Sequence, residues 1–341
     1  MDLIYMDSQR KDVGVLLDYE LDLAFGEDEN DFECQIQADQ HCCEDGSFLY
    51  IEGTEYGGIV DSIEVDTAAN EVTYRGRTWH GILGSKVIIP LKTGEGSTAS
   101  VTVKTADSSG ASLVDKYLII SGDANRCIDF IINRCGLESL FMASSSLAGV
   151  NINYQFNRYT DAYSGLVKML SSAGLKLCLE VKNGQAVLSS EAKYNYATDD
   201  EFDSDLVEFK LRKNYKAVNH LICLGSGELE NRMIVHLYAD SSGNISQTQT
   251  ATGLNEYAAV FDYSNVESQE ELIKSGTEQL KKLLEPADLS IDFDANSDSY
   301  DVGDIVGAID NITGITVSSA ISKKIVTIKK GQTTISYKVG E

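Results

Sequence analysis

The stretch VGVLLDYELDLAF (residues 13–25) decides how the beginning of the chain is interpreted. Apolar side chains recur in it at every second position, a pattern that is typical of a β-strand with one buried face. The alternating residues are Val15, Leu17, Tyr19, Leu21 and Leu23. We therefore expect an extended segment whose odd-numbered side chains pack in a core.

Similar strand patterns fill residues 1–105. In DFECQIQ, the side chains of Phe32, Cys34 and Ile36 share one face. Further extended stretches follow at short spacing, with Gly, Asn and Asp between them. These stretches are GGIVDSIEVD, NEVTYRG and SKVIIPL. Residues 1–105 are therefore predicted to form an N-terminal β domain, a small antiparallel barrel or sandwich, of which we favour the β-barrel.

Residues 106–200 have a different pattern, in which helices occur. GDANRCIDFIINRCG carries apolar residues at helical spacing, and Asp123 is placed to cap its start. TDAYSGLVKMLSSAG predicts a second helix, with Thr160 as its N-cap. Two alternating stretches then flank Asn183 and Gly184, which is a strong signal for a β-hairpin. This range is therefore predicted to be an α+β insert.

Residues 201–341 return to strand patterns, as in VNHLICLG and RMIVHLYAD. One helix interrupts them at about residues 266–285, with a capping box at Ser268 and Glu271 and a stop at Pro286. We predict a second β-barrel domain here. The predicted fold class is α+β, mostly β, with two small antiparallel β-barrel domains flanking a mixed α+β insert.

The composition excludes several classes of partner. The chain has 341 residues and a formal charge of −25, from 53 acidic and 28 basic residues. Such a surface repels phosphate backbones and anionic membranes. No stretch approaches the roughly 18 apolar residues of a membrane span, and the beginning lacks the pattern of a secretory signal. Seven cysteines without regular spacing indicate buried thiols in a reducing cytoplasm.

An acidic stretch, DFDANSDSYDVGD (residues 292–304), raises the question of a metal site. The oxygen-bearing residues that alternate in it, as at the start of a calcium loop, are Asp292, Asp294, Asn296 and Asp298. A helix–loop–helix calcium loop also needs Gly at position six and Glu at position twelve. Ser297 and Gly303 stand there instead. We therefore favour a strand followed by a turn, and these four residues are the only calcium candidate.

Other candidate chemistry does not assemble in the sequence. HCC (residues 41–43), with Cys34 upstream, could supply soft metal ligands, but a zinc site normally needs a second pair. His220 and His236 lie inside strand patterns, which favours half-buried or surface positions over a catalytic base. The sequence lacks a nucleophile elbow, and GEGS lacks the context of a phosphate loop. We therefore predict no catalytic residue and no cofactor, and the residues favour a structural or binding protein.

Four stretches together resemble a known family. They are LDLAFGEDENDFECQI, GTEYGGIVDSIEVDT, YRGRTWHGILGSKVIIP and the closing YDVGDIVGAIDNITGITVSSAISKKIVTIKKGQTTISYKVGE. In these the chain resembles the baseplate-hub (tail-associated, Gp37-like) proteins of siphophages and prophages, which are related in architecture to contractile-tail hub proteins. The stretches are fold signatures, so they define architecture more tightly than activity.

The resemblance implies a virion structural protein of the phage tail tip rather than an enzyme. Two related β-barrels per chain would assemble as a homotrimer, whose pseudo-sixfold ring docks on the tail tube and presents threefold symmetry to the spike or tip. Closing such a ring would hide exposed strand edges. The implied partners are further copies of the chain and the tail-tube, distal-tail and spike or tip proteins. DNA would pass through an acidic lumen without specific binding, in a virion tail assembled in the bacterial host cytoplasm.

The same resemblance gives individual residues structural roles. Gly53, Gly57 and Gly58 are expected at turns or bulges, Gly303 and Asp304 at the start of a strand, and Trp79, the only tryptophan, in a core.

Two alternative functions stay open. A carbohydrate-binding module for the host surface would use exposed aromatics, and the chain has 17 tyrosines. A tail-associated cell-wall hydrolase would need an enzymatic extension, which we do not expect because Glu341 follows soon after the predicted second barrel.

Overall fold

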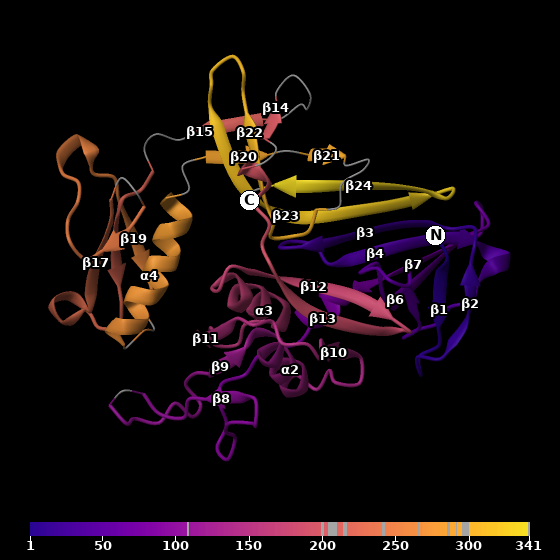
Figure 1. Ribbon diagram of the computed structural model, residues 1–341, viewed down its shortest axis with the longest axis horizontal. Helices are drawn as coiled ribbons and strands as arrows, with labels where there is room; N and C mark the ends of the chain where they lie inside the picture. Colours follow the sequence, from indigo (N-terminus) through magenta and orange to yellow (C-terminus); the bar gives the residue numbers. More distant parts are fainter. Residues whose placement is uncertain are drawn as a thin grey trace. The chain divides into compact units, whose positions relative to one another are not determined.

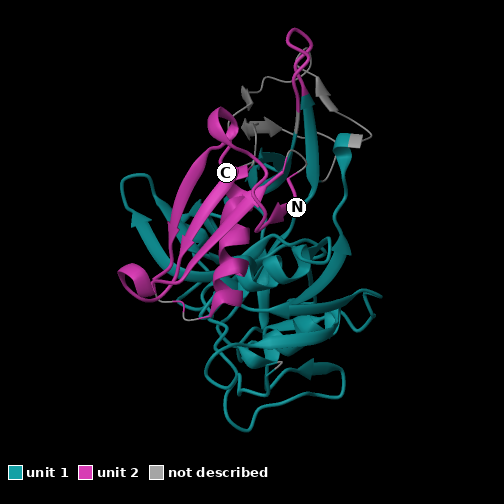
Figure 2. Cartoon of the chain, turned by 90° about the vertical axis from the view of Figure 1, so that its left-hand side faces the viewer, with its two compact units in different colours: residues 1–208, 291–308, 318–340 teal, residues 209–290, 309–317, 341 magenta. Residues whose placement is uncertain are grey.

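The computed structural model places the chain in two compact units, shown in Figure 1 and, by colour, in Figure 2. Unit 1 comprises residues 1–208, 291–308 and 318–340, and unit 2 comprises residues 209–290, 309–317 and 341. The structure describes residues 1–107, 109–198, 201–203, 210–213, 217–240, 243–264, 266, 268–284, 287–290, 292–294 and 300–339. The end of the chain therefore returns to the unit that its beginning forms.

Unit 1 is built on one sheet of twelve strands. The strand order is β14-β22-β23-β3-β4-β7-β6-β5-β1-β2, with β24 paired to β23 and β21 paired to β24. The strands are β1 (Leu3–Met6), β2 (Asp12–Leu16), β3 (Glu20–Gly26), β4 (Asp31–Gln37), β5 (Phe48–Tyr50), β6 (Gly57–Asp66), β7 (Glu71–Thr78), β14 (Glu201–Asp203), β21 (Asp292–Asp294), β22 (Ile305–Ile309), β23 (Thr316–Lys329) and β24 (Gln332–Val339).

The C-terminal hairpin β23–β24 extends the N-terminal sheet. β23 pairs antiparallel with β3, so that Val326 lies opposite Leu23, and Figure 1 shows the two elements side by side. Val326, Leu23 and Phe32 are buried in one apolar core. The predicted class, α+β and mostly β, is confirmed. The two closed barrels are not found among the strand pairings of the described residues. Instead, β23 pairs with β3, so the C-terminal strands belong to the same sheet as the N-terminal strands. The predicted domain ranges stay a prediction.

The α+β part of unit 1 packs on a second core. Its helices are α1 (Trp79–Gly84), α2 (Ala124–Arg134) and α3 (Ala162–Ser171), and its strands are β8 (Val101–Val103), β9 (Ile119–Asp123), β10 (Phe141–Ala143), β11 (Asn151–Gln155), β12 (Leu175–Lys182) and β13 (Gln185–Ala192). Two three-stranded sheets result, β11-β9-β8 and β10-β13-β12. Trp79, Ile128, Leu166 and Leu188 meet in the core. The core therefore joins all three helices to the hairpin β12–β13.

Unit 2 is a sheet covered on one side by a helix. The sheet order is β18-β17-β16-β19. The elements are β16 (His220–Leu224), β17 (Ile234–Ala239), β18 (Ile245–Ser246), β19 (Ala258–Asp262) and α4 (Gln269–Leu284), with β15 (Lys210–Lys213) paired to β20 (Ala287–Ser290). Leu272 and Leu280 of α4 share a core with Leu221, Cys223 and Leu237. The helix predicted at about residues 266–285 is found as α4.

The stretch VGVLLDYELDLAF (residues 13–25) only partly forms the single strand that its alternation predicts. Leu21 and Leu23 of β3 are buried, whereas Val15 is 47% and Leu17 is 80% exposed. A turn between β2 and β3 separates the stretch into two strands, and Leu16 is the residue of β2 that enters the core. Because a strand buries alternate residues, this change of register moves Val15 to the outer face.

Local signals predicted the hairpin and one helix cap. Asn183 and Gly184 both have positive φ, at 51° and 71°, in the two-residue turn between β12 and β13. The Asp123 carboxylate accepts from the backbone N–H of Asn125 at 3.0 Å, as predicted for an N-cap. The N-cap of α3, however, is Asp161 and not Thr160, because the helix begins one residue later than predicted.

The segment SKVIIPL is not a strand. Val87 forms an isolated bridge with Asp161, and Ile88 donates its backbone N–H to the Thr160 carbonyl. Pro90 lacks an N–H and cannot continue a ladder. The short helix α1 just before it was not predicted; it is capped by Thr78, whose side chain accepts from Gly81.

The residues singled out as structural lie in structural positions. Trp79 is fully buried, stacked on Phe48 and edge-on to Phe141. Gly57 has a φ of 141°, and a Cβ there would lie 2.3 Å from the Leu49 carbonyl oxygen, so only glycine allows the close approach.

The helices of the described part of the chain include none with the length and apolar character of a membrane span.

Candidate functional site

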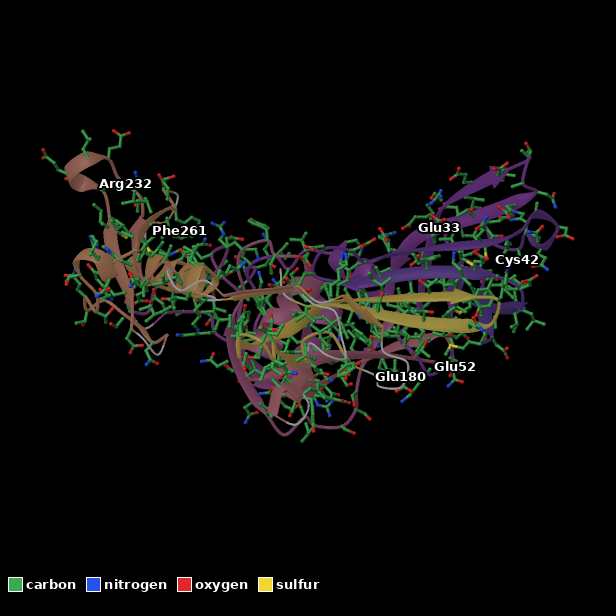
Figure 3. The ribbon with its side chains drawn as sticks, turned by 90° about the horizontal axis from the view of Figure 1, so that it is seen from above. Glu33, Cys42, Glu52, Glu180, Arg232 and Phe261 are labelled. Atoms are coloured by element: carbon green, nitrogen blue, oxygen red, sulfur yellow. The ribbon has the colours of Figure 1, made fainter. Side chains whose placement is uncertain are left out.

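The outward side of β3, β4, β6 and β7 carries charged side chains in register, and we call it the acidic face. Asp22 lies opposite Glu33, and Glu33 lies opposite Arg75 in the next strand. The neighbouring residues Leu21 and Cys34 point to the other side and are buried. Figure 3 shows Glu33 among these N-terminal strands. Alternation thus gives one sheet a core side and a charged side.

The acidic face lines a hollow of about 650 Å³. Six acidic and three basic residues line it, so its net formal charge is negative. The acidic residues are Glu20, Asp22, Glu29, Asp31, Glu33 and Asp61, and the basic ones are Arg75, Arg77 and Lys329. A cationic group would be attracted to this hollow, and a phosphate backbone would be repelled.

The hollow contains both paired and unpaired carboxylates. Arg77 binds Asp61 through two contacts of 2.7 Å, and Arg75 pairs with Glu33 at 2.7 Å. Asp22 and Asp31 form no salt bridge within the described part of the chain. Burial raises the pKa of Asp31, with Glu29 adding to it, and burial likewise raises the pKa of Asp22 although Lys329 opposes it. These two carboxylates would therefore gain from a bound cation.

Behind the sheet, the buried residues Lys176, Asp304 and Lys324 meet the partly exposed Glu55 and Asp301, and we call these five residues the buried ion cluster. Lys176 Nζ is 2.8 Å from Asp304 Oδ2 and 2.6 Å from Asp301 Oδ2. Lys324 Nζ is 2.7 Å from Glu55 Oε1. The five residues come from β12, β23, the turn before β6 and the loop before β22. The cluster therefore ties together segments of unit 1 that are far apart in sequence.

Each lysine of the cluster is kept charged by its partners. Burial works against the ammonium of Lys176, but its hydrogen bonds to Asp301 and Asp304 outweigh this and raise its pKa. Burial also opposes the charge of Lys324, whose pKa is nevertheless raised by Glu55 and nearby groups. Lys324 also lies 5.6 Å from the Tyr56 ring centroid, within reach of a cation–π interaction. Sequence reasoning did not find this cluster.

His80 borders the cluster as a neutral group. Its Nε2 is 3.9 Å from Glu55 Oε2, and its ring stacks on Phe25 at 4.5 Å between centroids. Burial, assisted by the positive charge of Lys324, lowers the pKa of His80 to about 3. The imidazole is therefore uncharged at neutral pH and serves as packing.

The HCC stretch forms a turn that we call the cysteine turn (His41, Cys42 and Cys43). The Tyr74 hydroxyl accepts the backbone N–H groups of Cys42 and Cys43, at 2.9 Å and 3.2 Å, and lies 2.9 Å from His41 Nδ1. The two thiol sulfurs are 3.8 Å apart. The hydrogen bond with Cys42 and burial raise the pKa of the Cys43 thiol, and the nearby thiols of Cys42 and Cys34 add to this. Sequence reasoning identified the thiols but not Tyr74.

In unit 2, the two strand histidines are joined to a carboxylate. His220 Nδ1 lies 2.7 Å from Glu256 Oε1, and His220 Nε2 lies 2.8 Å from His236 Nδ1. His236 is exposed, as predicted, whereas His220 is buried and not half-buried or at the surface, because its ring packs against His236 and Tyr238. Because the carboxylate can only accept, His220 donates to it from Nδ1, and His236 donates to His220 when both rings are neutral. Glu256 was not identified from the sequence.

The calcium candidate is only partly described. Asp292 and Asp294 lie in β21, opposite Lys338 and Ser336 of β24, as the strand interpretation requires. Asn296 and Asp298 lie outside the described residues, so the calcium question stays a prediction. Among the residues that the structure describes, no group of three or more His, Cys, Asp or Glu side chains is arranged to hold a metal ion.

Comparison by sequence finds no relative: no protein-family model matches the chain, and no curated protein matches it significantly. Comparison by structure gives matches along the whole chain. A tail protein from Neisseria meningitidis is 12% identical over 100% of this chain and 96% of its own, with a TM-score of 0.53.

Two prophage proteins match similarly. The 43 kDa tail protein of prophage MuSo2 from Shewanella oneidensis is 11% identical over 99% of this chain and 98% of its own, with a TM-score of 0.56. The prophage tail protein gp18 from Listeria monocytogenes is 14% identical over 99% and 94%, with a TM-score of 0.52. The chain therefore has the fold of phage and prophage tail proteins, as the resemblance in sequence implied.

Proposed function

We propose that this protein is a structural component of a phage or prophage tail tip, a hub that joins the tail tube to the spike or tip. The observation that carries the proposal is the end-to-end match to three tail proteins, which covers 99–100% of this chain and 94–98% of theirs. A fold shared over the full length supports a shared architectural role better than a match to one domain would.

The hub would assemble as a homotrimer with pseudo-sixfold to threefold symmetry adaptation. Strand β2 supports self-association, because in the described part of the sheet it pairs only with β1. Its outward residues Val13 and Val15 are 58% and 47% exposed, and Leu17 follows at 80%. An edge strand with exposed apolar side chains favours pairing with another chain. Tail-tube, distal-tail and spike or tip proteins are the other proposed partners.

The acidic face would line the passage for DNA. Its hollow carries six carboxylates against three cations, and the whole chain carries a charge of −25. DNA would then pass without specific binding, because like charges repel it. Charge mapping on the assembled ring tests this: a neutral or basic channel would contradict it.

The proposed role is structural, not enzymatic, in a virion tail assembled in the cytoplasm of a bacterial host. Peptidoglycan hydrolysis by the purified chain would contradict this role. Specific glycan binding by the isolated chain would favour the carbohydrate-binding module instead.

Light scattering combined with electron microscopy tests the assembly. We expect a mass near three times 37.2 kDa and ring images of threefold outline. Substituting Val13→Lys and Val15→Lys together should shift the mass toward the monomer, since charges on an edge strand block pairing. Val65→Lys is a control for charge added to an exposed apolar side chain away from β2, because Val65 is 57% exposed and pairs with Val72 of β7. A wild-type monomer at all concentrations would contradict the self-assembling ring.

A further inference from the structure

A short ribbon in the α+β part of unit 1 presents apolar side chains to solvent. Val87 forms a bridge with Asp161, and the backbone N–H of Ile88 donates to the Thr160 carbonyl. Successive residues of an extended segment point to opposite sides. Because Ile88 is buried, Val87 and Ile89 lie on the outer side, where they are 48% and 38% exposed. Packing within the described chain therefore does not account for these two side chains.

Tyr159, which comes just before this ribbon's second segment, has a strained backbone. Its φ is 57°, in the left-handed region that a bulky residue rarely adopts. Its side chain is 59% exposed, and Cζ of the Arg158 guanidinium lies 5.5 Å from its ring centroid. Stability does not explain an exposed ring at this position, since glycine would take the same backbone conformation without strain. Strain of this kind is typical of binding surfaces, and tyrosine and arginine are enriched in protein interfaces.

Two cations accompany these side chains, and we call Lys86, Val87, Ile89, Arg158 and Tyr159 the tyrosine patch. Lys86 and Arg158 are exposed, and neither has a salt-bridge partner among the residues that the structure describes. The chain as a whole carries a charge of −25. Two copies therefore repel each other over much of their surfaces, and a contact between them is favoured where one copy offers cations. The tyrosine patch offers both cations and apolar side chains.

The edge strand β2 carries the complementary side chains. The exposed apolar residues Val15 and Leu17 are followed by Asp18, which is also exposed. The two cations that precede β2 in the sequence lie at the opposite end of the strand, so a contact with the patch has one favoured direction, with Asp18 beside Arg158. Figure 1 shows β2 well apart from α3, the helix that begins just after the patch, within unit 1. When the two surfaces meet, they therefore belong to different copies.

We propose that the tyrosine patch of one copy binds the β2 edge of a second copy, with Tyr159 as the apolar anchor and Arg158 facing Asp18. A contact between two different surfaces is heterologous, and its repetition by rotation closes a ring. The inference rests on the proposed ring-forming hub, and it names the surface that receives the β2 edge in that ring.

Sedimentation equilibrium of the full-length chain tests the contact. Tyr159→Gly should weaken association about tenfold or more, because the anchor is lost. The variant should stay folded, since glycine adopts the turn without strain, and urea unfolding followed by Trp79 fluorescence checks this. Arg158→Glu should weaken association by a similar factor. Lys104→Glu is the control, because it makes the same change of charge at an exposed residue just after β8, and it should change association by less than about twofold.

A charge reversal identifies the receiving partner. Arg158→Glu and Asp18→Arg should each weaken association, whereas the two substitutions in one chain should recover most of the loss, because every contact then carries the reversed pair. Such coupling reports on a contact between copies, since the two residues lie on separate surfaces of unit 1.

Three outcomes would contradict the contact. Association that resists Tyr159→Gly and Arg158→Glu, but is lost when Val13 and Val15 are both changed to lysine, would overturn the contact and leave the hub proposal standing. A double variant that associates no better than Arg158→Glu alone would overturn the pairing of the patch with β2. A wild-type chain that is monomeric at all concentrations would overturn this contact together with the self-assembling ring.

Discussion

The two units of this chain both bury one side of a sheet, but they differ in what the other side carries. In unit 1, the outward side of β3 and β4 presents carboxylates that are partly paired with arginines. In unit 2, the outward side of β17 and β19 presents Ile234 and Val260, which are 50% and 64% exposed. Alternation alone therefore shows which residues enter a core, while the composition of the other side indicates whether it meets water or another surface.

The interactions that stabilise the interior of each unit also differ. Unit 1 joins distant segments through the buried ion cluster, in which Lys176 and Asp304 are 128 residues apart. Unit 2 relies on the apolar contact between α4 and its sheet. Buried charges are costly when one partner is removed, and close apolar contacts are sensitive to added volume. The following substitutions test this difference, in order of decreasing effect.

Lys324→Ala should have the largest effect, a loss of about 3–5 kcal/mol from the stability of unit 1, because Glu55, whose side chain is only 19% exposed, is left without its cation. Urea unfolding followed by the fluorescence of Trp79, the only tryptophan, reports on unit 1. The double variant Lys324→Met with Glu55→Gln should lose much less, because it removes both charges. Equal losses in the two variants would show that packing, and not the charge, matters.

Acid should destabilise unit 1 through His80. The folded pKa of His80 is about 3, below its ordinary 6.5, so the unfolded chain binds the proton first. This contribution to stability is complete above pH 6.5 and is lost as the pH falls toward 3. The expected slope is roughly 1.4 kcal/mol per pH unit.

His80→Phe is the control for the acid effect. It should flatten the dependence of the Trp79 unfolding transition on pH between pH 6 and pH 4 by about that slope. An unchanged slope in the variant would assign the acid sensitivity to other groups.

Gly276→Ala should destabilise unit 2 by about 1–3 kcal/mol, although alanine is the better helix former. A Cβ at this position of α4 would lie 2.4 Å from Cys223 Sγ and 2.8 Å from Leu237 Cδ1. Hydrogen exchange of the β16 and β17 amides measures the effect. Adding Cys223→Ala should recover part of the loss; a double variant that is less stable than the sum of the single variants would contradict the steric explanation.

Arg75→Gln should have the smallest effect, below about 1 kcal/mol, because exposed ion pairs contribute little. Arg75 contacts Glu33 and Glu64 on the acidic face, and all three side chains are largely exposed. The same Trp79 unfolding experiment should show a difference that shrinks in high salt. A loss comparable to that of Lys324→Ala would erase the distinction between the buried and the exposed charges.

Short-range signals in the sequence predicted much of the local structure. The alternation in DFECQIQ matches β4, where Phe32, Cys34 and Ile36 are buried. Asn183-Gly184 gave the correct hairpin, because only a few residue pairs adopt its two positive φ values. Predictions were wrong where a neighbouring residue could serve equally well, as at Thr160, or where one turn shifts a register, as at Leu17.

In the candidate sites too, the sequence identified some residues but not the partners that the fold brings to them. The sequence places Cys42 and Cys43 side by side, but Tyr74, which orders them, comes from another strand. The histidines of β16 and β17 were visible as strand residues, whereas their partner Glu256 lies in a loop. No periodicity links such residues, because the contacts follow from strand pairing and not from spacing along the chain.

The sequence by itself determined the fold class, the position of most strands and of three helices, the acidic surface and the resemblance to tail-hub proteins. These follow from interactions between residues a few positions apart, or from composition. Only the tertiary structure decided that the C-terminal hairpin pairs with β3, that Lys324 meets Glu55 and that Tyr74 anchors the cysteine turn. The separations along the chain run from 31 positions, between Tyr74 and Cys43, to 309 positions, between Glu20 and Lys329, and the geometry exists only once the sheet has formed.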